Sequence, residues 1–247
     1  MKKVALAEVP SIPADHPDLT GVRVKTVISR DTVGAKRGML SIAEFAVGGV
    51  HTLHRHDSSA QISYLLSGKG EHLTENGPIA IEAGDATYVP RNSWHGFRNT
   101  GTDKAFLLSI YSPAAHLADA GYETYRGEID RSKPAKVALA SLASARGDTI
   151  GSNRFLLGAN TLEPGHRHEA GLLPQEDEFL YILEGSAVFL GTGSTVALSA
   201  GDVAYLLANE NRALKNQEGA MTRMLFGYFG PVAREESAAQ THTVAHS

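Results

Sequence analysis

The chain repeats itself at a spacing of 117 residues, and this repeat limits its possible folds more than any other feature. The matching pairs are Tyr64–Gly68 with Tyr181–Gly185, Gly84–Tyr88 with Gly201–Tyr205, and Asn99 with Asn216. Three matches in the same order indicate a duplicated structural unit rather than a coincidence of Gly-Asp turns.

A pair of histidines also recurs, at a shorter spacing. His54 and His56 match His166 and His168 at 112 residues. Because the downstream matches keep 117, this alignment predicts five extra residues in the second copy, within residues 169–177.

The repeat settles the number of domains. A length of 247 residues, at about 150 residues per domain, leaves one large or two small domains open. The repeat favours two. The predicted organisation is residues 1–115 for the first domain, 116–144 for a helix and linker, 145–230 for the second domain, and 231–247 for a flexible tail. A short helix is expected from Pro113 to Ala120, capped by Gly121.

Within each copy, short apolar or alternating runs are separated by Gly, Asn, Asp and Pro. Such runs predict antiparallel strands in a sandwich or barrel, and long helical periodicity is missing. The predicted strands are Gln61–Ser67, Ala86–Val89, Ala105–Tyr111, Phe179–Leu183, Val203–Leu207 and Thr222–Tyr228.

Composition excludes several classes of function. The chain has no Cys, a formal net charge of −4 and 11 His. Without Cys there is no disulfide framework, thiolate metal site or Cys nucleophile. An acidic chain lacks the basic face of a nucleic-acid-binding protein. No apolar run is long enough for a membrane span or signal peptide, so we expect a cytoplasmic protein.

A series of spaced residues in the first copy carries the chemistry. The series runs Gly48, His54, His56, Gln61, Gly68, and then Gly84, Pro90, His95, Asn99. Its intervals resemble the two motifs of the cupin superfamily. Two identities depart from them: Gln61 stands where Glu is usual, and Asn92 where Gly is usual. Since the pattern occurs once per repeat, the chain resembles a bicupin.

This resemblance implies an all-β fold of two tandem antiparallel β-barrels, of the double-stranded β-helix or jelly-roll type. It implies metal ligation by His54, His56, Gln61 and His95. The residues support this interpretation independently, because His54 and His56 share one strand face and inward side chains of a small barrel converge. Three imidazoles and one oxygen suit one divalent first-row metal per chain. We expect iron, and Mn, Ni, Co or Zn fit the same ligands.

Gln61 changes the charge of the predicted site. A neutral amide leaves the positive charge of the metal uncompensated, which raises its Lewis acidity and favours an anionic substrate. Our hypothesis is that Gln61 ligates through its amide oxygen. The alternative is that it only forms hydrogen bonds inside the barrel.

The second copy has a degenerate ligand set. His166, His168 and Glu178 fill three predicted ligand positions, but Arg212 stands where the third histidine is expected. A protonated arginine does not ligate a metal. One interpretation is a lost site in which Arg212 pairs with Glu178. The others are a weak 2-His-1-carboxylate site, or an Arg212 that binds a substrate carboxylate.

Several other residues are assigned by position. His51 lies at an odd offset from His54, so it is expected off the ligand face. The remaining histidines His16, His72 and His116 are expected to be solvated, and Trp94 to take part in packing. The predicted substrate pocket is lined by Ser63 and Phe97, with Arg212 contributed by the second copy.

The resemblance implies a metalloenzyme that acts on a small organic molecule. Quercetinase-like and pirin-like dioxygenases are the members that we expect it to resemble in activity, with the metal in the first barrel. The alternatives are a redox-neutral isomerase, decarboxylase or lyase, as in the bicupin isomerase of bacilysin biosynthesis, or a non-catalytic binding protein. We expect no nucleic-acid or membrane partner. Strand edges allow a homodimer, or the two barrels cover each other's edges.

Overall fold

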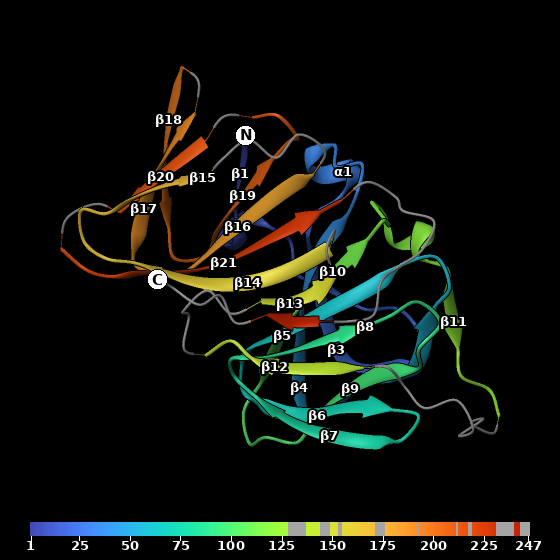
Figure 1. Ribbon diagram of the computed structural model, residues 1–247. Coiled ribbons are helices and arrows are strands. Elements are labelled where there is room, and N and C mark those ends of the chain that lie inside the picture. The colour runs from blue at the N-terminus through green and yellow to red at the C-terminus, as the bar shows by residue number, and fades with distance from the viewer. Residues whose placement is uncertain are drawn as a thin grey trace.

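The structure is a computed structural model that describes residues 1–127, 137–143, 149–152, 155–170, 176–191, 193–210, 212–216, 219–230 and 240–242. These residues form antiparallel strands arranged in two curled units, which confirms the predicted all-β fold (Figure 1). The helices of the described chain are short: η1 (Leu6–Glu8), α1 (Arg30–Val33) and η2 (Leu117–Ala120). No helix of the described residues could span a membrane.

The first unit is one large curled sheet. Its main path runs β12 (Ala138–Ser141), β8 (Asp85–Val89), β5 (Ala60–Ser67), β10 (Ala105–Ser112), β4 (Met39–His56), β9 (His95–Asn99), β6 (Lys69–Thr74) and β7 (Gly77–Glu82). Off this path, β3 (Leu19–Ile28) and β11 (Tyr122–Thr124) pair with β4, and β2 (Ile12–Pro13) pairs with β3. The 18-residue strand β4 therefore connects four neighbours.

The second unit has two sheets. One runs β1 (Lys2–Ala5), β19 (Asp202–Leu206), β16 (Asp177–Glu184), β21 (Thr222–Phe229), β14 (Phe155–Leu162), β13 (Thr149–Ser152) and β22 (Gln240–His242). The other runs β15 (Arg167–Ala170), β20 (Arg212–Asn216), β17 (Ser186–Gly191) and β18 (Ser194–Ser199). All six strands expected from the sequence are present in the two units, with ends that differ from the predictions by at most two residues.

Three strands from the ends and the linker of the chain cover sheet edges, and one of them crosses between the units. The N-terminal strand β1 pairs with β19 of the second unit, where Figure 1 shows it in dark blue among the orange strands. Strand β12, from the predicted linker, pairs with β8 of the first unit. Strand β22, from the predicted tail, pairs with β13. These pairings cover sheet edges that would otherwise expose unpaired backbone groups.

The segment after β10 follows its prediction in part. The expected helix from residue 113 is the short η2, which begins at Leu117. His116 caps its start, since its Nδ1 accepts a hydrogen bond from the Ala118 amide at 3.1 Å. Gly121 ends it with a φ of 71°, the left-handed conformation that favours glycine at this position.

Asn92 explains one departure from the family pattern. Its φ is 62°, and Asn209, 117 residues further on, has a φ of 65°. Asparagine is the residue besides glycine that adopts this left-handed conformation most readily. Both copies therefore have the same left-handed turn at this position, a conformation that glycine also favours.

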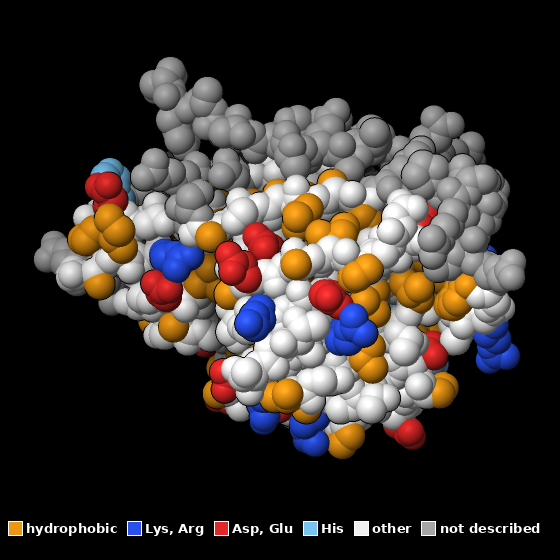
Figure 2. All heavy atoms as spheres, turned by 90° about the horizontal axis from the view of Figure 1, so that it is seen from below, with side chains coloured by type: hydrophobic (Ala, Val, Ile, Leu, Met, Phe, Trp, Pro, Cys, Tyr) orange, Lys and Arg blue, Asp and Glu red, His pale blue; other side chains and the backbone are white. Residues whose placement is uncertain are grey.

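One apolar core joins the two units. It includes Leu108 and Ile62 from the first unit and Phe179 and Phe229 from the second. Gly38 is required at this contact, because a Cβ there would lie 1.9 Å from the Phe229 ring. On the face that Figure 2 shows, Lys and Arg side chains alternate with Asp and Glu and form no basic patch.

An ion pair also joins the units. Arg37 Nη1 donates to Asp177 Oδ1 at 2.7 Å, and the Asp177 side chain is fully buried. Asp177 also accepts hydrogen bonds from the Tyr205 hydroxyl at 2.7 Å and from the Ala208 amide at 3.0 Å. One carboxylate thus connects the first unit to two segments of the second.

The substitution Asp177→Ala is expected to lower the free energy of unfolding by about 3 kcal/mol, because it leaves the Arg37 charge and the Tyr205 hydroxyl without their acceptor. Urea denaturation measures the change. Glu184→Ala is the control, since it removes an exposed partner of Arg223 and is expected to cost less than about 1 kcal/mol. Equal losses in the two variants would contradict the proposed contribution of the inter-unit pair.

Candidate metal centre

The predicted histidines of the first unit meet through strands β4 and β9. His54 and His56 are two residues apart on β4, so their side chains share one face. His95 opens β9 and pairs directly with His54. The β4–β9 register shifts between His51 and His54, which marks a bulge immediately before the predicted ligands.

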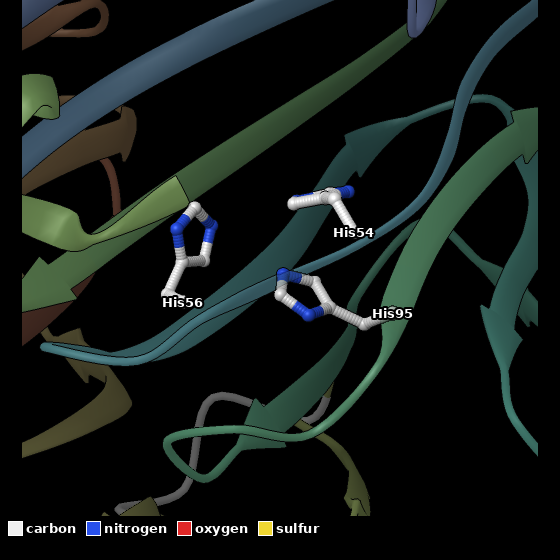
Figure 3. Close-up of side chains that lie close together, drawn as sticks. All are labelled: His54, His56 and His95. Carbon is white, nitrogen blue, oxygen red and sulfur yellow. The ribbon is translucent and has the colours of Figure 1, made fainter. Parts of the chain in front are cut away.

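The three imidazoles form a compact buried cluster. Their nearest ligand atoms all lie within 4.8 Å of one another, and each residue is at most 2% exposed. The ring centroids of His54 and His95 are 4.2 Å apart, and the ring of His56 lies 5.1 and 5.3 Å from them. Figure 3 shows the three rings turned toward one another from their strands.

The backbone fixes which ring nitrogens carry protons. His54 Nδ1 donates to the Thr52 carbonyl at 2.9 Å, and His95 Nδ1 donates to the Ser93 carbonyl at 3.0 Å. In a neutral imidazole, the other nitrogen then carries a lone pair. His54 Nε2 and both ring nitrogens of His56 have no hydrogen-bond partner among the described residues. Buried polar atoms of this kind require a partner, and a cation supplies one.

Gln61 completes this arrangement. Its Oε1 lies 2.9 Å from His95 Nε2, while its Nε2 donates to Ser63 Oγ at 2.9 Å. Because His95 Nδ1 already carries the proton, two lone pairs face each other across this distance. A divalent metal fits these residues, since it would accept both lone pairs together with those of His54 and His56. The orientation supports the hypothesis that Gln61 ligates through its amide oxygen.

Burial keeps the cluster neutral. Desolvation lowers the pKa of His95 to about 4, against the hydrogen bond to Ser93. Desolvation and the neighbouring histidines lower the pKa of His56 to about 3 and the pKa of His54 well below its usual value. Neutral imidazoles at pH 7 are available as ligands without loss of a proton.

His51 belongs to this site, contrary to the sequence prediction. Its ring stacks on the His54 ring at 3.7 Å between centroids. Its Nε2 donates to the Tyr122 hydroxyl at 3.0 Å, and that hydroxyl donates to Asp18 Oδ2 at 2.8 Å. The alternation rule failed here because the bulge after His51 moves both His51 and His54 to one face.

A cavity of about 610 Å³ opens in front of the cluster. Ser63 and Phe97 line it, as expected. His72 also lines it and is 2% exposed, so the expectation that His72 is solvated is wrong. The remaining lining is mainly apolar: Val22, Val24, Met39, Ala43, Phe45, Leu107 and Tyr111 among others. No Lys or Arg of the described chain lines this cavity.

The other singled-out residues lie away from the cluster. The side chains of His16 and His116 are 39% and 42% exposed at the cavity entrance. Trp94 packs outside the cavity as expected, with the Arg55 guanidinium 4.8 Å from its ring centroid and Tyr125 against its edge.

The register of the second unit contradicts the predicted offset of 112 residues. His51 pairs with Phe97 in the first unit, and His168 pairs with Leu214 in the second. His51 and His168 are 117 residues apart, and so are Phe97 and Leu214. His168 is therefore the counterpart of His51 and not of His56.

The hydrogen bonds of two asparagines to backbone carbonyls give the same spacing of 117 residues. Asn99 Nδ2 donates to the Phe45 carbonyl at 3.2 Å, and Asn216 Nδ2 donates to the Leu162 carbonyl at 2.8 Å. These residues too are separated by 117. A constant spacing leaves no room for the predicted five-residue insertion within residues 169–177.

The predicted second site loses its histidines by this correction. In the cross-strand register the counterpart of His54 is Ala170, which pairs with Arg212 as His54 pairs with His95 and has no ligating side chain. His166 is 67% exposed and lies 3.7 Å from the Glu163 carboxylate, whereas Glu178 is buried. The side chains of His168 and Arg212 lie outside the described part, so the pairing predicted between Arg212 and Glu178 stays a prediction.

The comparison with known families agrees with the fold and the repeat. The model of the Cupin domain family matches residues 41–111 and residues 159–228, more than half of the chain. The chain therefore belongs to the cupin family, and with two matched segments it is a bicupin. The two segments end 117 residues apart.

Individual proteins resemble parts of the chain. The protein SchB of Streptomyces halstedii is 29% identical over 117 residues, which are 47% of this chain and 84% of SchB. Polyketide synthase CurC of Streptomyces cyaneus is 26% identical over 102 residues, 41% of this chain and 66% of CurC. A solved variant of the oxalate decarboxylase of Bacillus subtilis has a TM-score of 0.71 at 15% identity, covering 92% of this chain and 77% of that one. At this identity the likeness shows the fold.

The purified chain is expected to bind about one equivalent of divalent metal, as its donor set requires. His95→Ala and Gln61→Ala should lower this content, because each removes a lone pair from the cluster. His166→Ala and Glu178→Gln are the controls and should leave it unchanged. Elemental analysis by mass spectrometry gives the stoichiometry. If the wild-type chain binds two equivalents of metal and Glu178→Gln binds one, the second unit has a metal site after all.

The metal-free protein is expected to lose stability between about pH 6.5 and pH 4. The unfolded chain takes up protons below the ordinary histidine pKa of about 6.5, whereas folded His72 and His95 stay neutral down to about 3 and about 4. Each such histidine contributes a slope of about 1.4 kcal/mol per pH unit over its interval. Urea denaturation at several pH values measures the slope. It should become shallower in His72→Phe and stay unchanged in the exposed control His116→Phe.

Proposed function

We propose that this bicupin is a metal-dependent enzyme that acts on a small, largely apolar organic molecule in the cavity of the first unit. One observation carries the proposal: an uncharged set of buried lone pairs lies at the wall of an apolar cavity. The lone pairs belong to His54, His56, His95 and Gln61. A bound cation explains why these atoms converge, because it accepts their lone pairs together.

The charge of the site selects the reacting group. A divalent metal held there supplies a Lewis acid that favours the anionic form of a hydroxyl or enol oxygen. Because all four donors are neutral, they leave that positive charge uncompensated. The apolar wall excludes water and strengthens the attraction for an anionic oxygen. An enolate, phenolate or carboxylate oxygen is therefore the group that the cavity takes up.

The cavity favours an extended apolar substrate over a small diacid. Its volume of about 610 Å³ is that of a site for a molecule with one or more rings. A dicarboxylate would need cationic side chains for its second charge, and the described lining has no Lys or Arg. Oxalate, the substrate in the name of the B. subtilis neighbour, does not fit this requirement. The polyketide in the name of CurC is a compound class that does.

The reaction that we propose is dioxygen-dependent ring or chain cleavage with iron as the metal. Both atoms of O₂ enter the organic product and a carbon–carbon bond breaks, so the reaction requires no external reductant. The neutral ligands and the mainly apolar cavity support this proposal. A redox-neutral isomerisation, decarboxylation or elimination is the second candidate. The buried polar side chain of His72 in the cavity wall favours it, because such a reaction moves a proton at the substrate.

Oxygen consumption separates the two reactions. Protein loaded anaerobically with Fe(II), Mn, Ni, Co or Zn is mixed with a panel of phenols and 1,3-diketones, and O₂ uptake is followed with an electrode. Dioxygenase activity predicts about one O₂ per substrate consumed and ¹⁸O from ¹⁸O₂ in the product. The His95→Ala variant should show neither. If the substrate is converted at the same rate without O₂, the dioxygenase proposal is wrong and the redox-neutral reaction takes its place.

A further inference from the structure

His72 is a buried polar group of the cavity that the metal centre leaves unused. It lies on the inner face of β6, where Gly70, His72 and Thr74 alternate as buried residues with the more exposed positions. His72 is 2% exposed and lines the cavity. Its Nε2 has no hydrogen-bond partner among the described residues. A buried polar atom without a hydrogen-bond partner destabilises the fold unless a ligand supplies that partner.

Thr87 determines what His72 offers to the cavity. The Thr87 hydroxyl lies 3.3 Å from His72 Nδ1 and is fully buried. Its proton has no other acceptor among the hydrogen bonds of the described chain, so the arrangement that satisfies both groups has Thr87 donate to Nδ1. The remaining proton of the neutral ring then sits on Nε2. His72, whose side chain lines the cavity, therefore carries a buried N–H donor that has no partner among the described residues.

The donor stands beside the metal cluster but outside it. The rings of His72 and His95 are nearly parallel, with centroids 6.3 Å apart. His72 is not part of the group of ligand atoms that converge within 4.8 Å. The cavity wall thus holds the cluster of lone pairs and, with its ring centroid 6.3 Å from that of His95, a second kind of polar group. The rest of the lining is mainly apolar, with Ser41, Ser63 and Ser109 among its polar side chains.

We propose that His72 is the specificity-determining residue of this cavity, and that its Nε2–H donates a hydrogen bond to a carbonyl oxygen of the substrate. The proposal rests on the proposed function, because it requires that another oxygen of the same molecule faces His54, His56 and His95. The substrate class is an apolar molecule with two separated oxygens, one that ionises readily and one carbonyl. A molecule without the carbonyl would leave the N–H buried and unpaired, and sites of that kind reject such analogues.

Two probes that differ by one ketone oxygen isolate the carbonyl. In 3-hydroxyacetophenone the hydroxyl and the acetyl group occupy meta positions of the ring, so the two oxygens cannot bind the same metal ion. In 3-ethylphenol the ketone oxygen is absent. Calorimetric titration of the Zn-loaded protein avoids redox chemistry. Wild type is expected to bind the ketone at least about tenfold more tightly than the ethylphenol.

The variant His72→Phe keeps the size and flatness of the side chain and removes the donor. It should bind the two probes with equal affinity while its metal content stays unchanged. His116→Phe makes the same replacement at the cavity entrance and should keep the wild-type preference. The infrared carbonyl stretch of ¹³C-labelled ketone should shift to lower frequency in wild type and should not shift in His72→Phe.

The outcomes separate this proposal from the proposed function. If wild type binds both probes equally, or shows no infrared shift, the role of His72 is wrong and the apolar phenol site stands. If His72→Phe weakens both probes to the same extent, His72 is only structural. If metal-loaded wild type binds neither probe, the proposed substrate class is wrong, and so is the proposed role of His72. The absence of an infrared shift in wild type contradicts the proposal even if the variant does not fold.

Discussion

The bulge in β4 is the constraint on which the rest of the site depends. A regular strand would turn His51 and His54 to opposite faces, because they are three residues apart. The shifted register instead stacks their rings at 3.7 Å and sets His54 opposite His95. In the second unit, the pairing of β15 with β20 stays regular up to Ala170 and Arg212. The two copies of this hairpin therefore differ in backbone register at the positions of the ligands. Only the first copy has the register that brings His54 opposite His95.

Backbone carbonyls then set the chemistry of the cluster. His54 and His95 each donate Nδ1 to the carbonyl of the residue two positions earlier, so both rings are held with the Nε2 lone pair toward the cluster. Burial keeps the rings neutral, and Gln61 adds an amide oxygen in place of the family's carboxylate. A Glu at this position would neutralise part of the charge of a bound metal, whereas Gln leaves that charge for the substrate. This difference, together with the absence of Lys and Arg from the described lining, points to an ionisable oxygen on an apolar molecule.

The sequence predicts the parts of this structure that depend on local pattern and recurrence. Alternating apolar runs and the 117-residue repeat predict the strands and the duplicated fold, and the motif spacing predicts the residues that the first cavity brings together. Three features lie beyond such patterns. The bulge at His51 and the burial of His72 follow from pairing across β4, β9 and β6, which no single segment encodes. The second His-x-His pair at His166 and His168 imitates the first without sharing its register, because a two-residue motif recurs more easily than a backbone geometry.

The second unit contributes packing to a site that lies wholly in the first. Its Phe229 ring covers Gly38, and its buried Asp177 binds Arg37, which directly precedes that glycine and the start of β4 at Met39. Its sheet also takes up β1, so the first residues of the chain are fixed on the far unit. None of these contacts uses the predicted ligand positions of the second copy, so they do not depend on a metal site there. The second barrel is therefore needed whatever its own chemistry, because it holds one end of the strand whose other end carries His54 and His56.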